Sequence, residues 1–344
     1  MIRRRLRRAG LLGVALVAAA ALTAACGSSS PSGTSGSGSA KLFMIPKFTG
    51  IPPFTQADQG GAAMAKTYGY KLTYNGPSTG SATDQVNFIN QAAGSGYNGI
   101  FISADDPATV TPALQKAMKH GLKVVSFDSD VLPAGRNLFV EGTSTADIAK
   151  SELQMLGSQI GYSGNFVILS AQATDANQVA WNNQLKQDLT TDKQFANMKL
   201  LAIVNPPDDG APSAATYMQN IIARYPNIKG VIAPTTVAIA AAAQVLQQRH
   251  LCSKIVLTGL GDPQQMKPFV TSGCVKQFGL WSFSKEGEVA MCAMHGVLNG
   301  SLTGKTGQSF TCGSLGKFTV GPQQTVPAGP IEEFTKNNLS AYTF

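Results

Sequence analysis

The stretch that decides the fold of this chain is Gly121–Asp130, with the sequence Gly-Leu-Lys-Val-Val-Ser-Phe-Asp-Ser-Asp. A short apolar run that is β-branched at its centre and introduced by a glycine predicts a buried parallel strand over Leu122–Phe127. Side chains alternate along an extended chain, so Asp128 and Asp130 are expected to face the same way. Ligands of open α/β sheets lie beyond the carboxyl ends of the strands. A carboxylate there can accept hydrogen bonds from two vicinal hydroxyls, although each aspartate could instead be a helix cap or turn residue.

Strands alternate with helices on both sides of this stretch, which predicts parallel, doubly wound sheets. The chain has 344 residues, too many for one compact core, and the alternation begins again after about Glu141. We therefore expect two α/β domains of similar size. The other expected strands are Lys41–Ile45, Tyr70–Tyr74, Gly99–Ser103, Asn137–Glu141, Asn165–Leu169, Met198–Val204, Gly230–Ala233, Lys254–Thr258, Lys276–Trp281 and Lys317–Val320.

The net charge of +8 does not indicate a nucleic-acid partner. Five of those charges come from arginines within the first eight residues, and removing them leaves +3, which is too little for an electrostatic footprint. Charged residues make up 13% and hydrophobic residues 43% of the chain, as is typical of a globular protein.

The N-terminus has the pattern of an export signal, expected to span residues 1–26. The arginines precede the apolar run Ala9–Ala25, which at about 17 residues is marginal for a membrane span. The run ends in Leu22-Thr23-Ala24-Ala25-Cys26-Gly27, which resembles a bacterial lipoprotein box with Cys26 as the lipidated residue; the alternative is ordinary cleavage. Residues 27–40 are mostly Gly and Ser, as in a flexible tether. We expect an exported protein, lipid-anchored to the outer face of the cell membrane.

Four further cysteines allow three disulfide pairings. We favour Cys252–Cys274 and Cys292–Cys312, because both loops are short and an exported protein meets an oxidising compartment. The rival interpretation is a zinc site, but the chain has no C-x-x-C pair and no histidine at ligand spacing. We therefore expect no metal.

Polar side chains follow three strands that should end at one edge of the first sheet. Lys47 and Phe48 follow the first strand, Asp105 and Asp106 follow the third, and the two aspartates of the opening stretch follow the fourth. A cation beside several carboxylates offers both donors and acceptors to a polar ligand. The alternative for Lys47 is an exposed surface lysine.

Trp181 and Trp281 are the only tryptophans of the chain, and both lie just past polar or strand-like segments. A flat indole suits the C–H face of a sugar ring. The alternative for each is packing in a core or between domains.

Several motifs, taken in order, resemble a group of bacterial solute-binding proteins that includes the autoinducer-2-binding proteins and the rhamnose- and polyol-binding proteins of ABC importers. The resemblance covers nearly all of the chain after the tether. It is carried by Ile45-Pro46-Lys47-Phe48-Thr49-Gly50, Tyr74-Asn75-Gly76-Pro77 and Phe127-Asp128-Ser129-Asp130, and by the segments Val231–Pro234, Gly259–Phe269, Phe278–Trp281 and Phe334–Leu339.

The resemblance implies a type I periplasmic binding protein fold, in which two α/β lobes joined by three crossings close on a ligand by a hinge. We place the crossings near Glu141, Leu280 and Cys312. The expected lobes are residues 41–141 with 281–311, and residues 142–280 with 312–344.

The same resemblance assigns ligand contacts by position. Lys47 and Asp128 match the lysine and aspartate that hold the ligand in the autoinducer-2 binders. Aligning the tryptophans makes Asn177 and Gln178 the next contacts, with Asn177 where those proteins have an aspartate, and Thr236 replaces a small apolar residue. These departures favour a neutral ligand with many hydroxyls, a sugar or sugar alcohol of the rhamnose, pentose or polyol class. The full expected set is Lys47, Phe48, Asp106, Asp128, Asp130, Asn177, Gln178, Trp181, Pro234, Thr236, Asp262 and Trp281, with Asp262 and Trp281 on the far wall.

The implied protein is a monomer without a cofactor, whose partner is an ABC-transporter permease. Autoinducer-2 binding, for uptake or for signalling to a sensor, is the first alternative. A secreted carbohydrate enzyme using Asp128 and Asp262 is the second, since glycoside hydrolysis needs two carboxylates at fixed separation. The chain has no H-E-x-x-H or phosphate loop to support an enzyme.

Overall fold

The central strand is present and buried. In this computed structural model, which describes residues 39–342, β4 spans Lys123–Phe127 and only Lys123 is partly exposed. The expected signal peptide, Cys26 and all of the tether but its last two residues lie outside the described residues. Ala40, the last of the expected tether, is already bonded through its carbonyl to the backbone N–H of Lys71.

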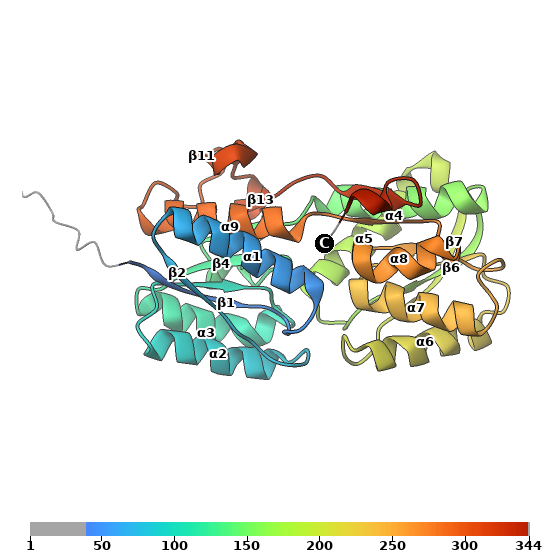
Figure 1. Ribbon diagram of the computed structural model, residues 1–344, viewed down its shortest axis with the longest axis horizontal. Helices are drawn as coiled ribbons and strands as arrows, with labels where there is room; N and C mark the ends of the chain where they lie inside the picture. The colour runs from blue at the N-terminus through green and yellow to red at the C-terminus, as the bar shows by residue number, and fades with distance from the viewer. Residues whose placement is uncertain (1–38, 343–344) are drawn as a thin grey trace, which may run out of the picture. The chain divides into compact units, whose positions relative to one another are not determined.

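The first lobe is built on a six-stranded sheet in which all pairs are parallel. In Figure 1 this lobe occupies the left side of the picture. Because the strands are parallel, their carboxyl ends share one edge, which faces the second lobe. The strand order is β13 (Thr325–Pro327), β5 (Leu138–Glu141), β4, β3 (Gly99–Ile102), β1 (Lys41–Ile45) and β2 (Lys71–Tyr74).

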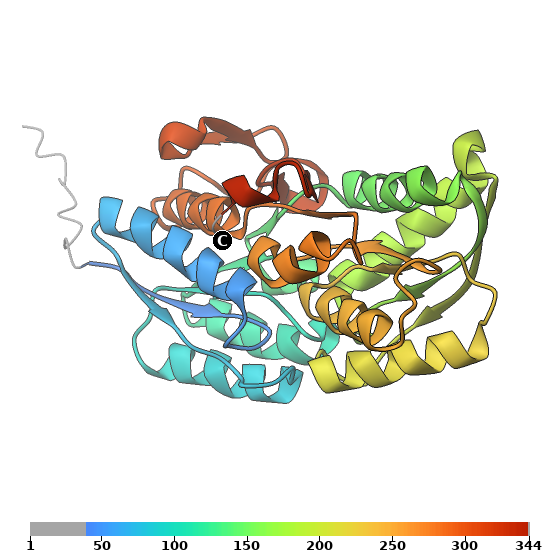
Figure 2. The ribbon, with the colours of Figure 1, turned by 45° about the vertical axis from the view of Figure 1, so that its right-hand side comes forward.

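Two pairs of helices cover the first sheet. On one face α1 (Pro52–Thr67) lies against α9 (Phe283–Leu298), and on the other α2 (Ala82–Gly94) lies beside α3 (Pro107–Lys119) (Figures 1 and 2). The first pair approaches very closely, since a Cβ on Gly60 would lie 2.0 Å from the carbonyl oxygen of Ser284. Side chains of the sheet and of the second pair form a separate apolar core that includes Phe43, Ile89, Ile100, Leu114 and Val124.

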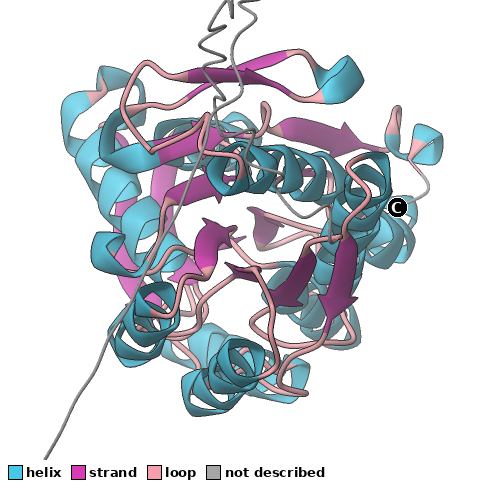
Figure 3. Ribbon diagram, turned by 90° about the vertical axis from the view of Figure 1, so that its left-hand side faces the viewer, coloured by secondary structure: helices cyan, strands magenta, loops and turns pink. Residues whose placement is uncertain are grey.

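The second lobe repeats the plan around a four-stranded parallel sheet. Figure 3 shows most strands of the molecule lying between helices. The strand order is β7 (Asn197–Val204), β6 (Ser163–Leu169), β8 (Gly230–Ala233) and β9 (Val256–Gly259). The helices are α4 (Thr145–Ile160), α5 (Ala176–Thr191), α6 (Ala211–Arg224), α7 (Thr236–Gln248) and α8 (Pro263–Thr271).

The third crossing between the lobes differs from expectation. The chain leaves the first sheet after β5 and continues into α9 after β10, and β13 then pairs with β5, so the chain stays in the first lobe through Pro327. It then enters β14 (Glu332–Thr335), which pairs antiparallel with β10 (Gln277–Leu280) beside the second sheet. The boundary near Cys312 is therefore wrong. The sequence gives little sign of β13, because three residues that end in proline have no readable periodicity.

The remaining elements are short. An antiparallel ribbon of β11 (Ser309–Thr311) and β12 (Lys317–Thr319) lies over α9. The single-turn 3-10 helices are η1 (Pro133–Gly135), η2 (Lys193–Phe195), η3 (Gly313–Leu315), η4 (Pro322–Gln324) and η5 (Leu339–Ala341). Within residues 39–342 no helix has the length and apolar character that crossing a membrane requires.

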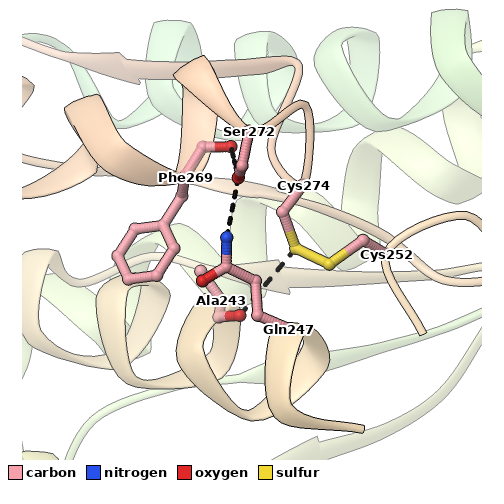
Figure 4. Close-up of a disulfide and its surroundings, with 6 residues drawn as sticks. All are labelled: Ala243, Gln247, Cys252, Phe269, Ser272 and Cys274. Atoms are coloured by element: carbon pink, nitrogen blue, oxygen red, sulfur yellow. Dashed lines mark hydrogen bonds between the residues drawn. A yellow bond between two sulfur atoms is a disulfide. The ribbon is translucent and has the colours of Figure 1, made fainter. Parts of the chain in front are cut away.

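Two cysteine pairs lie at disulfide distance, and they are the pairs that the sequence favours. The sulfurs of Cys252 and Cys274 are 1.99 Å apart in the second lobe, and those of Cys292 and Cys312 are 2.08 Å apart in the first. Figure 4 shows the second-lobe pair joining the segments that follow α7 and α8. Beside it, the amide of Gln247 donates a hydrogen bond of 2.7 Å to the Ser272 hydroxyl.

Candidate functional site

A cavity lies between the two lobes, beyond the carboxyl ends of both sheets. The volume in which the centre of a water-sized molecule fits is about 70 Å³. By the same measure, a single buried water needs about 10–15 Å³. The cavity is therefore scaled to a small polar molecule. Nine of the twelve expected contacts line it: Lys47, Phe48, Asp128, Asn177, Gln178, Trp181, Pro234, Thr236 and Trp281.

A chain of buried polar side chains crosses from one lobe to the other. The ammonium of Lys47, just after β1, donates to Asp175 Oδ2 at 2.7 Å and to Asn177 Oδ1 at 3.3 Å. The amide of Asn177 in turn donates to Asp128 Oδ1 at 3.4 Å, and the Ser103 hydroxyl donates to Asp128 Oδ2 at 2.6 Å. The network fixes the charged groups of the first lobe against the start of α5 in the second.

Asp128 adopts an unusual backbone conformation that separates it from Asp130. Its φ is +56°, in the left-handed region where aspartate is one of the few residues other than glycine to occur. The turn ends the alternation of the strand, so the expectation that both aspartates face the same way is wrong. Asp130 instead accepts two hydrogen bonds from Arg136, at 2.6 and 2.8 Å, and lines a neighbouring hollow of about 300 Å³.

Glu286, on α9, joins two parts of the site that the sequence analysis treated separately. Its Oε1 accepts the backbone N–H of Asp128 at 2.7 Å, and its Oε2 accepts the indole N–H of Trp281 at 2.7 Å. The side chain is completely buried. Sequence analysis missed this role; the available signal was a glutamate in the first turn of the helix that follows Trp281.

Aromatic rings form one wall of the cavity. Trp281 stacks on Phe283, with ring centroids 5.0 Å apart, and meets Trp181 edge-on at 5.8 Å. Phe54 from α1 contacts Phe283 at 6.3 Å. The indole of Trp281 also lies where Gly142 has no side chain, since a Cβ there would be 1.9 Å from its Nε1.

The opposite wall comes from the starts of α5 and α7. The amide of Gln178 is held on both sides, accepting from the Ser170 hydroxyl at 2.8 Å and donating to the Pro234 carbonyl at 2.9 Å. Thr235 caps α7 by accepting from the N–H of Ala238, which leaves Thr236 in the first turn of that helix at the cavity. A helix N-terminus carries partial positive charge and favours electron-rich oxygens.

Three expected contacts lie outside this cavity, each for a physical reason. Asp130 is paired with Arg136, as described above. Asp106 caps α3 through the N–H of Thr109, and the completely buried Asp262 caps α8. Asp262 also accepts a hydrogen bond from Gln56 at 3.1 Å, so Asp262 is not part of the far wall and does not form a pair with Asp128. The sequence analysis raised a helix cap as the alternative for Asp128 and Asp130, but not for Asp106 or Asp262.

Burial raises the pKa values of the acids of the site by more than their charged and hydrogen-bonding partners lower them. It raises the pKa of Asp128, against the opposing effects of Lys47 and Ser103. It also raises the pKa values of Asp175 and Glu286 well above their usual range. Burial alone would lower the pKa of Lys47, but the surrounding carboxylates outweigh it and raise that pKa, so the lysine stays charged.

The acid in direct contact with Lys47 is one that the sequence analysis passed over. Alignment on the tryptophans assigned the acidic position to Asn177, whereas Asp175, two residues earlier, forms the ion pair. Asp209, which precedes α6, also lines the cavity and was not expected there. The available signal was that both follow strand ends of the second sheet.

Comparison with known proteins gives a consistent result. A family model described as a periplasmic binding protein domain matches residues 42–302. A sugar ABC transporter structure from Actinomyces odontolyticus is 36% identical, with a TM-score of 0.72, and the match covers 89% of this chain and 98% of that one. An ABC transporter solute-binding protein from Clostridium phytofermentas with bound L-rhamnose is 30% identical, with a TM-score of 0.84 and the same two coverages. LsrB from Clostridium saccharobutylicum, in complex with AI-2, shares the fold at 23% identity, with a TM-score of 0.83 over 89% of this chain and all of that one.

Proposed function

This chain belongs to the periplasmic binding protein family, and from that premise we propose that it captures a small sugar or sugar alcohol between its lobes for an ABC importer. The family consists of extracytoplasmic solute-binding proteins. The observation that carries the proposal is the network of Lys47, Asp175, Asn177 and Asp128 beside an aromatic wall at one cavity.

The polar side of the cavity suits vicinal hydroxyls. Asp128 Oδ1 has only one long hydrogen bond, of 3.4 Å from Asn177, so it retains capacity to accept from a ligand. Lys47 and the first turn of α7 supply donors within the same small volume. A ligand that both donates and accepts at neighbouring atoms matches this arrangement better than a carboxylate or a phosphate would.

The apolar side narrows the class of sugar. Phe54, Leu260, Leu280, Trp281 and Phe283 together line a continuous apolar part of the cavity. This wall favours a ligand with an exposed C–H face or a methyl group, such as a 6-deoxyhexose. The L-rhamnose bound by the 30% identical relative supports the same choice, so we propose rhamnose ahead of the pentoses and polyols.

Autoinducer-2 is the second candidate ligand, and Asp175 is the observation that favours it. The replacement of an acid by Asn177 argued against this ligand in the sequence. The ion pair between Lys47 and Asp175 restores an acid to the same side of the cleft. The protein would then serve in uptake or in signalling to a sensor.

The cellular setting of the proposal follows from the N-terminal sequence. Lipidation of Cys26 would anchor the exported protein to the outer face of the cell membrane, within reach of a permease. Metabolic labelling with a fatty-acid analogue tests this part separately. The wild-type chain should be labelled, and a Cys26→Ser variant should not.

Ligand screening tests the central proposal. The oxidised protein, unfolded and refolded to remove any co-purified ligand, should show a raised melting temperature with one member of a panel, because only the native state binds. The panel comprises L-rhamnose, pentoses, pentitols, tetritols and autoinducer-2, and calorimetry then measures the affinity. If no member shifts the melting temperature or produces binding heat, the proposal fails.

A further inference from the structure

Three acids from both lobes meet at the edge of the cavity. Asp209 lines it and Asp175 holds Lys47, but none of the three is assigned to a hydroxyl of the proposed sugar. Asp105 follows β3 in the first lobe, whereas Asp175 and Asp209 precede α5 and α6 in the second. One oxygen from each carboxylate lies within 4.8 Å of the others. Asp105 and Asp175 do not line the cavity, so a sugar held there would not satisfy them.

The buried oxygens of this cluster lack partners. Asp175 is completely buried and Asp105 is 2% exposed, yet Oδ1 of each has no hydrogen bond. Their other oxygens are engaged, since Asp175 Oδ2 accepts from Lys47 and Asp105 Oδ2 accepts from the N–H of Ser81 at 2.8 Å. A buried acceptor left without a partner is costly, which indicates that something else occupies its lone pairs.

The free oxygen of Asp105 lies near a side chain of the second lobe. A Cβ placed on Gly80 would be 3.5 Å from Asp105 Oδ1 and 2.8 Å from the side-chain amide nitrogen of Gln172. Asp175, in the second lobe, also leaves an oxygen without a local partner. It stands at the N-cap of α5 but makes no capping hydrogen bond, whereas Asp106, Asp262 and three serines cap their helices with their side chains.

The charges in this region are unbalanced. Asp105, Asp128, Asp175 and Asp209 surround Lys47, and of the ion pairs within residues 39–342 only that of Lys47 with Asp175 reaches the group. One ammonium does not neutralise four carboxylates, and in a buried setting the repulsion among them is poorly screened.

We propose that Asp105, Asp175 and Asp209 bind a divalent cation, Ca²⁺ in preference to Mg²⁺, which ties the two lobes together beside the ligand cavity. Ca²⁺ coordinates oxygen at about 2.3–2.6 Å, so ligands on its opposite sides lie about 4.6–5.2 Å apart, which accommodates the spacing of the cluster. Mg²⁺ demands near-ideal octahedral geometry, which three carboxylates from separate segments do not provide. The partly exposed Asp209 gives the ion a route from solvent.

Calorimetric titration of the chelator-treated protein with CaCl₂ and with MgCl₂ tests the proposal. No sugar is present, so the result does not depend on the proposed transport function. We expect one Ca²⁺ per chain with an affinity on the order of 10⁻⁴ M, as in extracellular calcium modules, and weaker Mg²⁺ binding. Absence of Ca²⁺ binding, or Mg²⁺ binding as tight as Ca²⁺ binding, would overturn the proposal.

Matched variants assign the binding to this cluster. Asp209→Asn and Asp105→Asn should each weaken Ca²⁺ binding at least ~10-fold, because each removes a charged ligand. Asp208→Asn is the control, since Asp208 hydrogen-bonds to Gly210 and Ser213 and is not a member of the cluster. Thermal unfolding in chelator should show that all three variants fold. Unchanged binding in both cluster variants, or equal loss in the control, would contradict the assignment.

Discussion

The two lobes build their halves of the cavity from different parts of the α/β unit. The first lobe contributes Lys47 and Asp128 from the ends of β1 and β4, whereas the second contributes Asn177, Gln178 and Thr236 from the first turns of α5 and α7. The first half is therefore charged and set by the sheet. The three second-lobe residues just named are neutral and set by helix starts, whose partial charge favours hydroxyl oxygens. Asp209 is the charged side chain that this lobe adds to the lining.

The two lobes also differ in the hydrogen bonding of their buried glutamates. Glu286 of the first lobe is bonded through both oxygens, to Asp128 and to Trp281. Glu152, on α4 of the second lobe, is just as buried, but its Oε1 has no partner. Glu286 therefore orients residues of the cavity, whereas Glu152 does not line it. The comparison teaches that burial of an acid alone does not identify a functional residue.

Substitution of Glu152 should give the largest effect. Burial raises its pKa from 4.5 to about 8, so the folded state binds more protons than the unfolded state between those values and loses stability as pH rises through that range. Glu152→Gln should therefore be more stable than the wild type at pH 9, by up to about 5 kcal/mol, and equally stable near pH 4. Urea unfolding at both pH values measures this, and an advantage that is the same at both would contradict the explanation.

Substitution of Asp128 tests the charged half of the cavity. Asp128→Asn should weaken ligand binding by roughly 2–4 kcal/mol, because a neutral acceptor replaces a charged one. The fold should persist, since asparagine also tolerates the left-handed backbone found at this position. Asp130→Asn is the matched control, because it breaks the pair with Arg136 outside the cavity. Calorimetry should separate the two variants, and equal affinities would refute the role of Asp128.

Removal of the disulfides compares the lobes in stability. The two pairs close loops of similar sequence separation, 22 and 20 residues, so the chain-entropy model predicts about 3 kcal/mol for each. Replacing Cys252 and Cys274 together, or Cys292 and Cys312 together, by serine should lower the unfolding free energy by similar amounts. Mass spectrometry under non-reducing conditions checks the pairing first. Free thiols in the native protein would contradict both disulfides.

The smallest effect should come from the first crossing. Gly142→Ala places a methyl group against the indole of Trp281, and such overpacking typically costs about 1–3 kcal/mol. The displaced indole should weaken ligand binding more than it lowers the melting temperature. Gly329→Ala, at the third crossing, is a fair control because a Cβ there meets no atom within 4 Å. Equal effects of the two variants would show that Trp281 does not depend on the space at Gly142.

The parts of the fold that the sequence predicted were those with strong periodicity. The strand over Leu122–Phe127 and the alternation around it are apolar, regular and bounded by turn residues, so most bounds shift by only a residue or two in the structure. The strands β13 and β14 could not be predicted, because they are three and four residues long and their pairing depends on distant partners.

The site was predictable where one residue type at a strand end decides the chemistry, as for Lys47 and Asp128. It was not predictable where a backbone angle decides direction. The left-handed φ of Asp128 turns Asp130 away from the cavity, and the residue types alone do not predict this φ. Asp262 and Asp175 both precede helices, yet one caps its helix and the other pairs with a lysine from the opposite lobe. Only tertiary contacts distinguish them.

The attachment of Trp281 to Glu286 has an experimental consequence. One indole is tied to α9 of the first lobe and the other belongs to α5 of the second, with ring centroids 5.8 Å apart, and the chain has no other tryptophan. A rotation that parted the lobes would separate the two rings and admit water to both. The intrinsic tryptophan fluorescence of the unlabelled protein should therefore report the opening of the cleft, because both tryptophans lie where the two lobes meet.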